Sequence, residues 1–341
     1  MPVPARLAHI ERETWTPDDE LIRLLGKVDG DLVVLGAAGK VGVSLCRMAR
    51  AAFDALPGER QVFAVSRFSD PSARSALDDA GVRTVRADLL DESAVDGLPD
   101  AVNVVFMVGR KFGTTGSEAL TWAVNTYLPG LVARRYPGAR MVAFSSGNVY
   151  PLVPAVTGGC DEGTPPDPVG EYAQSCLGRE RVLTHACEAG GTPLALIRLN
   201  YAIDCRYGVL TDIARAVRDG EPVALGNGAV NVVWQGDANR YALAALTAAT
   251  TPALTLNVTG PETIGARWLA YQLGQRLGAT PLFSGSESDT ALLSNAAACF
   301  GMFGYPRVSL AQMLDWTVEW LVDGGETLDK PTHFATRTGR F

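Results

Sequence analysis

Lysine, histidine and cysteine are scarce in this chain of 341 residues. The six cysteines form no CxxC pair and the three histidines are far apart, so neither a disulfide framework nor a metal site is indicated. No apolar run approaches the roughly 20 residues that a membrane-spanning helix needs. The N-terminus lacks the apolar core of a signal peptide. We therefore expect a cytoplasmic protein with no metal and no membrane partner.

The chain also lacks any basic block, internal repeat or low-complexity segment. Its formal net charge is -7, with acidic and basic residues mixed along the sequence, which argues against binding to nucleic acid or to anionic membranes. Hydrophobic residues make up 47% of the chain, enough to fill a large core. A small-molecule partner is the remaining expectation.

Apolar runs typical of buried strands alternate with helical patterns, and this alternation predicts an α/β fold with a Rossmann-type, doubly wound parallel sheet. The helix after the first strand carries an i, i+3, i+4, i+7, i+8 stripe that should pack on the sheet. The stripe residues are Leu45, Met48, Ala49, Ala52 and Phe53. The expected strands are Leu32 to Leu35, Val62 to Val65, Val82 to Val85, Val104 to Val108, Met141 to Phe144 and Leu194 to Ile197.

Three regions follow from this pattern. Residues 1–30 form an N-terminal helical extension, in which Thr16 is the expected capping hydroxyl of a helix. Residues 31–200 form the Rossmann domain, and residues 201–341 form a smaller C-terminal α/β lobe, interleaved with the first, that binds the substrate. In that lobe we expect short strands around Val230 to Trp234 and Leu254 to Val258, and helices near Trp268 and Leu310.

A glycine-rich loop, residues 36–42, joins the first strand to the striped helix. Glycine at these spacings allows a tight turn and lets backbone N–H groups approach a pyrophosphate at a helix N-terminus. The loop therefore predicts a dinucleotide site in residues 31–200. Its predicted contacts are Gly36, Ala38, Gly39, Lys40, Val41 and Gly42.

The residues after the second strand are Ser66 and Arg67, where an acidic residue would favour NAD. A hydroxyl and a guanidinium can bind the 2′-phosphate instead, so NADP is predicted over NAD. The alternative is that Arg67 is a solvated surface charge.

Two further segments carry a family resemblance. Phe144 to Tyr150 reads FSSGNVY, and Glu171 to Glu180 reads EYAQSCLGRE. From Asp31 onward the chain resembles the extended short-chain dehydrogenase/reductase family, also called the NAD-dependent epimerase/dehydratase family. The resemblance implies that Tyr172 is the catalytic acid/base and that Ser146 orients the substrate.

The same resemblance implies further contacts. Asp88 and Leu89 would lie near the adenine, although Asp88 is equally explained as a loop cap. The other implied cofactor contacts are Val108, Gly109, Asn125 and Tyr172. The implied substrate contacts are Ser146, Gly147, Asn148 and Asn200. The helices around Ser117 to Ala133 and Tyr172 to Ala189 imply a homodimer.

The chain departs from the family at Cys176, where the family has a lysine four residues after the tyrosine. An ammonium there would lower the pKa of the tyrosine, and a neutral thiol cannot. Either hydride chemistry is lost, or another cation supplies the field. Lys111, or its neighbour Arg110, follows the fourth strand and is the candidate, unless both are solvated loop charges. Cys176 itself is expected to act as a small hydrophobic residue, and its place in the motif keeps it among the candidate catalytic residues with Tyr172, Ser146 and Lys111.

Val230 stands where family members that act on nucleotide-diphosphate sugars have an arginine, so we expect a smaller substrate: a sugar, sugar acid or polyol derivative. Arg206 and Arg198 are candidate anion binders, unless Arg198 is structural. The leading hypothesis is an NADP(H)-dependent oxidoreductase or epimerase that acts on a hydroxyl or ketone. The alternatives are a cofactor-binding regulator and a non-redox lyase or cyclase on the same fold.

Overall fold

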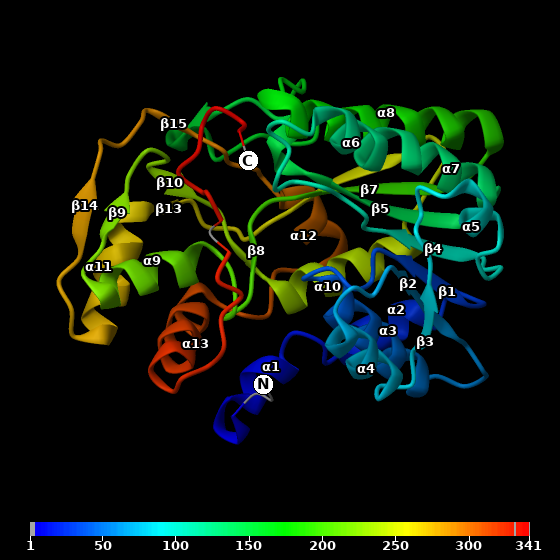
Figure 1. The fold of residues 1–341 in the computed structure, drawn as a ribbon, viewed down its shortest axis with the longest axis horizontal. Helices are drawn as coiled ribbons and strands as arrows, with labels where there is room; N and C mark the ends of the chain where they lie inside the picture. Colours follow the sequence, from blue (N-terminus) through cyan, green and yellow to red (C-terminus); the bar gives the residue numbers. More distant parts are fainter. Residues whose placement is uncertain (1–3, 331, 341) are drawn as a thin grey trace.

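The computed structural model describes residues 4–330 and 332–340 and is built on a seven-stranded sheet with the order β12-β7-β5-β4-β1-β2-β3 (Figure 1). Every neighbouring pair in this sheet is parallel. The predicted doubly wound α/β fold is therefore confirmed. The strands of the sheet are β1 (Leu32–Leu35), β2 (Val62–Ser66), β3 (Arg83–Arg86), β4 (Asn103–Phe106), β5 (Arg140–Ser146), β7 (Leu194–Leu199) and β12 (Leu254–Val258).

Helices cover both faces of the sheet. On one face the buried stripe from Leu45 to Phe53 packs against the strands, as its periodicity predicts. This face carries α2 (Asp19–Leu25), α3 (Gly42–Asp54), α4 (Pro71–Asp78), α10 (Gln235–Ala244), η5 (Ala245–Thr247) and α12 (Ala297–Phe303). The other face carries α5 (Glu92–Asp96), α6 (Glu118–Trp122), the π-helical turn η2 (Ala123–Tyr127), α7 (Leu128–Arg135) and α8 (Gly170–Gly190).

One expected strand lies elsewhere than predicted. Residues 254–258 were expected in the C-terminal lobe, but they form β12, which pairs in parallel with β7 at the edge of the main sheet. The buried helix α10 returns the chain to the sheet beforehand. An apolar strand pattern gives the alternation of side chains but not the partner strand, so the sequence alone could not place β12.

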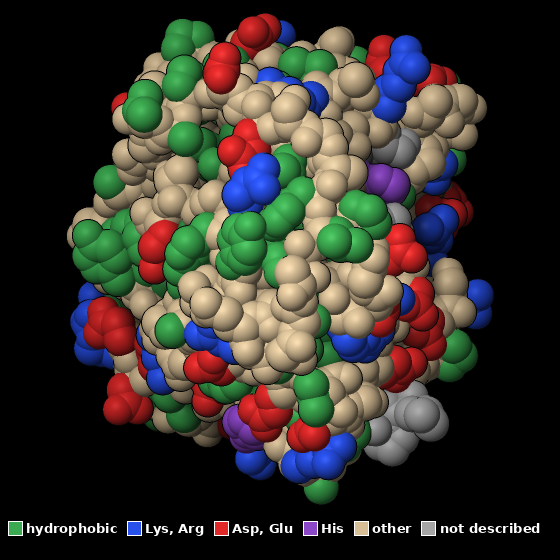
Figure 2. All heavy atoms as spheres, turned by 90° about the vertical axis from the view of Figure 1, so that its left-hand side faces the viewer, with side chains coloured by type: hydrophobic (Ala, Val, Ile, Leu, Met, Phe, Trp, Pro, Cys, Tyr) green, Lys and Arg blue, Asp and Glu red, His purple; other side chains and the backbone are tan. Residues whose placement is uncertain are grey.

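The C-terminal lobe has a separate hydrophobic core. Its helices are α9 (Val209–Asp219), α11 (Ala266–Leu277) and α13 (Leu310–Val322). Its short paired strands are β8 (Ala202–Ile203) with β11 (Val233–Trp234), β10 (Ala229–Val230) with β13 (Ile264–Gly265), and β9 (Pro222–Ala224) with β14 (Leu282–Ser284). On the side formed by α11 and β14, Trp268, Tyr271 and Leu282 are exposed, and Figure 2 shows hydrophobic side chains gathered on this face.

Shorter elements complete the chain. Strand β6 (Val153–Pro154) pairs with β15 (Thr290–Ala291), and 3-10 turns η3 (Gly147–Val149) and η4 (Ala155–Thr157) lie on either side of β6. The N-terminal region contains η1 (Ala5–Leu7) and α1 (Ala8–Arg12) before α2. The Asp18 carboxylate, not the expected Thr16 hydroxyl, caps α2 by accepting a hydrogen bond from Leu21 N at 2.7 Å.

Within the part of the chain that the structure describes, no helix combines the length and the apolar character needed to cross a membrane. The same residues hold no group of three or more His, Cys, Asp or Glu side chains placed to bind a metal ion.

Candidate active site

The glycine-rich loop lies between β1 and α3 and is packed too closely for larger residues. Gly36 has φ +91°, and a Cβ atom there would lie 2.9 Å from Val108 N. A Cβ atom at Gly42 would lie 2.5 Å from the carbonyl oxygen of Ala37. These two glycines are therefore needed for the tight turn and for the contact between the loop and the end of β4.

The backbone of this loop offers hydrogen-bond donors. Gly39 N and Gly42 N donate to carbonyl oxygens within the loop. By contrast, no acceptor among the described residues is bonded to the backbone N–H groups of Ala38, Lys40 and Val41. Unpaired N–H groups at the start of a helix of 13 residues suit the pyrophosphate of a dinucleotide, so these residues fit the predicted group.

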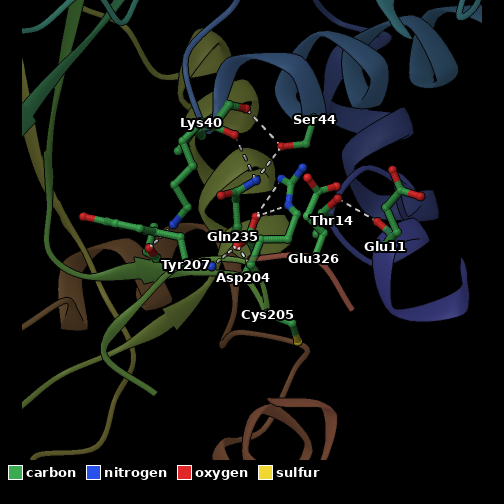
Figure 3. Close-up of polar contacts among 12 residues, drawn as sticks. Glu11, Thr14, Lys40, Ser44, Asp204, Cys205, Tyr207, Gln235 and Glu326 are labelled. Carbon is green, nitrogen blue, oxygen red and sulfur yellow. Dashed lines mark hydrogen bonds and ion pairs between the residues drawn. The ribbon is translucent and has the colours of Figure 1, made fainter. Parts of the chain in front are cut away.

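The side chain of Lys40 turns away from the loop (Figure 3). Its Nζ donates to the carbonyl oxygen of Ala202 at 2.8 Å and lies 4.5 Å from the centre of the Tyr207 ring. Burial lowers the pKa of this amine to about 8, while the charge of Asp204 acts in the opposite direction. Lys40 thus contributes its backbone to the loop, and its side chain ties the loop to the C-terminal lobe.

The residues after β2 and β3 have different roles. Ser66 is half-buried at the end of β2, and Arg67 is exposed. The Asp88 carboxylate accepts a hydrogen bond from Leu90 N at 3.1 Å, and Leu89 is buried in the core. Asp88 therefore caps its own loop, one of the two roles that the sequence allowed.

Tyr172 and Ser146 meet where α8 begins and β5 ends. The Ser146 hydroxyl accepts hydrogen bonds from Asn148 N at 3.2 Å and from Asn148 Nδ2 at 2.9 Å. Burial and the neighbouring Cys176 raise the pKa of the Tyr172 phenol, whereas hydrogen bonding with Ser146 and the charge of Arg179 lower it. The predicted pair is therefore brought together, and the phenol needs positive charge nearby to act as a base.

Cys176 lies on α8 one turn after Tyr172 and is buried. Burial raises the pKa of its thiol, so the thiol stays neutral near pH 7. This state agrees with the expected hydrophobic role.

Lys111 is the predicted substitute cation. Its Nζ lies 5.8 Å from the centre of the Tyr172 ring and 5.7 Å from that of Phe112. Burial lowers the pKa of the Lys111 amine to about 8, and interaction with Cys176 acts in the opposite direction. The neighbouring Arg110 instead folds back and donates to the carbonyl oxygen of Gly113 at 2.8 Å. Of the two candidates, Lys111 is the one that faces Tyr172.

Asn125 holds the loop that carries Lys111. Its Oδ1 accepts a hydrogen bond from Arg110 N at 2.8 Å, and its Nδ2 donates to Arg110 O at 3.0 Å and to the Ser175 hydroxyl at 2.9 Å. Asn125 belongs to the π-helical turn η2, a type of helix distortion found frequently at functional sites. All of these contacts are within the protein, and they fix the loop that runs from Val108 and Gly109 to Lys111.

Arg179 is a buried cation that the sequence reasoning missed. Its guanidinium donates to Asn125 O at 3.1 Å, Asn125 Oδ1 at 3.0 Å and Phe144 O at 2.6 Å. A Cβ atom on Gly109 would lie 3.3 Å from its Nη2. The charge of Arg179 lowers the pKa of both Tyr172 and Cys176. The sequence did offer one signal for this contact: Arg179 follows Tyr172 by seven residues, which is two turns of helix, so both residues lie on the same face.

The two arginines predicted to bind anions are both ion-paired. Arg198 Nη2 lies 2.7 Å from the Glu180 carboxylate, and its Nη1 donates to the Tyr150 hydroxyl at 2.8 Å. Arg206 Nη2 lies 2.7 Å from the Asp204 carboxylate. Arg198 is therefore structural, and Arg206 is held by the carboxylate two residues before it.

The other predicted substrate residues lie beside Ser146. Gly147 packs on Asn200, because a Cβ atom at Gly147 would be 3.1 Å from Asn200 Cβ. The buried Asn200 amide donates to the carbonyl oxygen of Leu292 at 3.4 Å. Asn148 lines a cavity together with Lys111, and other lining residues come from the end of the chain.

The sequence was compared with models of protein families and with curated proteins. The model of the NAD dependent epimerase/dehydratase family matches residues 32–254. No curated protein matches the chain.

Several solved structures share the fold. The UDP-glucose 4-epimerase of Thermotoga maritima, solved with UDP-glucose, is 16% identical, with a TM-score of 0.71 over 86% of this chain and 99% of that chain. The UDP-glucose 4-epimerase of Thermus thermophilus, solved with NAD, is 20% identical, with a TM-score of 0.68 over 85% and 98%. The UDP-glucuronic acid 4-epimerase of Bacillus cereus, solved with UDP-glucuronic acid and NAD, is 15% identical, with a TM-score of 0.70 over 86% and 99%. The family match spans more than half of the sequence, and on this evidence the chain belongs to the NAD-dependent epimerase/dehydratase family.

Proposed function

We propose that this protein is a nicotinamide-nucleotide-dependent oxidoreductase or epimerase that acts on a hydroxyl or ketone of a small carbohydrate-like substrate. The observation that carries the proposal is the meeting of Tyr172 and Ser146 with the Lys111 amine, 5.8 Å from the tyrosine ring, where the family lysine is replaced by Cys176. The glycine loop, with its unpaired N–H groups, lies at the same edge of the sheet.

The cofactor proposed is NAD. The sequence predicted NADP from Ser66 and Arg67, but the neighbours solved with a named cofactor contain NAD. Arg67 is exposed and is not built into a phosphate site by contacts with other described residues. The cofactor would be held by the N–H groups of Ala38, Lys40 and Val41 and would supply acceptance and return of a hydride.

The chemistry of the protein's own residues follows from their positions. Tyr172 exchanges a proton with the substrate oxygen, and Ser146 donates a hydrogen bond to that oxygen. Lys111 and Arg179 act on Tyr172 through their positive charge and so stabilise its phenolate. If a transient substrate ketone is reduced again on its opposite face, the same residues give an epimerase.

The family's homodimer is also proposed for this chain. Leu120 is exposed on α6 and is available for such an interface, whereas Leu131 is buried in the chain's own core. Size-exclusion chromatography with light scattering tests this assembly.

The decisive experiment measures cofactor binding and hydride transfer separately. Calorimetric titration should show binding of NAD⁺, and binding of NADP⁺ alone would overturn the choice of NAD. Incubation with sugars, sugar acids and polyols should produce absorbance at the wavelength of the reduced cofactor, or epimers detectable by NMR.

Tyr172→Phe should slow that reaction by about 10²–10⁴-fold while leaving NAD⁺ binding intact. Unchanged turnover in Tyr172→Phe would refute the acid/base role. Unchanged turnover in Lys111→Ala would refute the substitute cation. Activity that rises in Cys176→Lys would instead indicate that the site has lost part of the family's chemistry.

A further inference from the structure

Residues 332–340, here called the C-terminal segment, pass over the candidate active site and are held by both lobes. On the side of the C-terminal lobe, Thr332 N and its hydroxyl donate to the Asp212 carboxylate at 2.8 and 2.6 Å. The Asn227 amide donates to the carbonyl oxygen of Phe334 at 2.6 Å. The segment is drawn in red in Figure 1.

The other end of the segment lies against the Rossmann domain. Gly339 packs on the start of α8, because a Cβ atom at Gly170 would be 2.6 Å from Gly339 O. The His333 ring lies 6.0 Å from the ring of Phe112, the neighbour of Lys111. The C-terminal segment therefore spans the two lobes across the cavity beside Ser146.

The cavity beneath the segment is rich in basic groups. Lys111 lines it from the loop after β4, and His333 and Arg337 line it from the C-terminal segment. The described residues of its lining include Asn148, Tyr150 and Tyr201 but no Asp or Glu. A cavity with this composition attracts an anion rather than a neutral molecule.

Arg337 is held in place while keeping donors available. Its Nη1 donates to Asn227 Oδ1 at 3.2 Å and to Thr290 O, and its Nη2 donates to the Thr290 hydroxyl at 2.6 Å. These acceptors are neutral, and none of the contacts of Arg337 with the described residues is to a carboxylate. A guanidinium has five N–H donors, so the Nε hydrogen and one Nη2 hydrogen remain. Such a pair suits the two oxygens of a carboxylate or phosphate.

We propose that the substrate of this site carries a small anionic group, a carboxylate or phosphate, which binds to Arg337 and His333 of the C-terminal segment. This inference rests on the proposed function and names its substrate class as acidic sugar derivatives. The ion pairs at Arg198 and Arg206 support it, because neither of the arginines predicted from the sequence is available for this role.

The test compares two ligands that differ at one terminal group, which is charged in one and neutral in the other. Erythronate and erythritol have the same carbon and hydroxyl pattern, except that a carboxylate replaces one terminal alcohol. Calorimetric titration of the full chain with saturating NAD⁺ should show that erythronate binds at least about 10-fold more tightly than erythritol. Inorganic phosphate, as a third ligand, distinguishes a phosphate preference from a carboxylate preference.

Variants then locate the binding. Arg337→Gln should weaken binding of the preferred anion by about 10-fold or more, and His333→Gln should weaken it by a smaller factor. Arg340→Gln is the matched control, since Arg340 is an exposed arginine of the same segment outside the cavity lining. Thermal unfolding of each variant shows whether it is folded.

The proposal is overturned if neither anion binds, if erythritol binds as well as erythronate, or if folded Arg337→Gln binds the anion like the wild type. NAD⁺ binding, measured in the same samples, separates this failure from failure of the proposed function. If the wild type binds NAD⁺ but shows no preference for the anion, only the proposed substrate class is refuted. If the wild type does not bind NAD⁺, the proposed function itself is refuted.

Discussion

Two buried arginines, one on helix α8 and one on the neighbouring strand β7, have different hydrogen-bond partners. Arg198 on β7 lies 2.7 Å from the Glu180 carboxylate, so its charge is neutralised locally. Arg179 precedes Glu180 on α8, yet its three hydrogen bonds go to neutral oxygens of Asn125 and Phe144. The ion-paired Arg198 holds the sheet and helix together, whereas Arg179, which has no ion-pair partner among the described residues, keeps a positive charge that lowers the pKa of Tyr172 and Cys176.

Breaking the paired arginine should have the largest effect. Arg198→Met leaves the Glu180 carboxylate buried without its partner, which should lower the free energy of unfolding by about 3–5 kcal/mol. Urea unfolding measures this loss. Arg181→Met, at an exposed position on the same helix, is the control and should change stability by less than about 0.5 kcal/mol. A loss in Arg198→Met as small as that of the control would show that the pair is not important for stability.

Replacing Arg179 should reduce activity more than it reduces stability. Arg179→Met leaves neutral acceptors rather than a carboxylate, so the loss of stability should be about 1–3 kcal/mol, below that of Arg198→Met. Hydride transfer should fall by about 10–100-fold, because the Arg179 charge lowers the pKa of Tyr172 and its removal makes the phenolate harder to form. The kcat value should fall while the Kd for NAD⁺ changes little. Equal activity in the two folded variants would end the distinction between them.

Lys111 is the second cation expected to act on Tyr172, and its charge depends on pH. Burial lowers its pKa to about 8, so the amine is charged below that pH and loses its charge as the pH rises through it. Wild-type kcat should therefore decline above about pH 8, by up to about 10-fold per pH unit for a single ionisation. Lys111→Met should be slower at pH 7 and lack this decline, whereas Lys111→Arg should retain activity to higher pH. A profile shared by wild type and Lys111→Met would assign the ionisation to another group.

Lys40 is expected to make the stability of the protein depend on pH. Its folded pKa of about 8 lies below the ordinary value of 10.5, so the unfolded chain binds the extra proton between these pH values. The stability of the wild type relative to Lys40→Met should therefore rise from pH 8 to 10.5, by at most about 1.4 kcal/mol per pH unit. Urea unfolding of both proteins across this range measures it. A difference independent of pH would show that Lys40 is not desolvated.

The sheet and the glycine loop could be predicted because they depend on local patterns, whereas the pairing of Ser146 with Tyr172 was implied by the family resemblance. Strand periodicity and glycine spacing are written in adjacent residues, and the ends of parallel strands meet by topology. The same topology placed Lys111 at the correct edge of the sheet. No local pattern, however, fixes the partner of a strand, and β12 was therefore placed in the wrong lobe.

The parts that escaped prediction depend on contacts between distant residues. The contacts of Arg179 come from Asn125 and Phe144, more than 30 residues away. Arg206 is the exception, because the carboxylate that holds it belongs to Asp204, only two residues before it in the sequence. Arg337 and His333 drew no attention in the sequence because only the fold carries the end of the chain back to the cavity beside Ser146.

The bond from Lys40 to Ala202 has a thermodynamic consequence. It links the loop proposed to hold the cofactor with β8, the first strand of the lobe proposed to hold the substrate. If cofactor binding changes the free energy of substrate binding through this link, substrate binding must change the free energy of cofactor binding by the same amount, because coupling between two sites is reciprocal. A difference in cofactor affinity with and without substrate, reduced in Lys40→Met, would give that coupling a value.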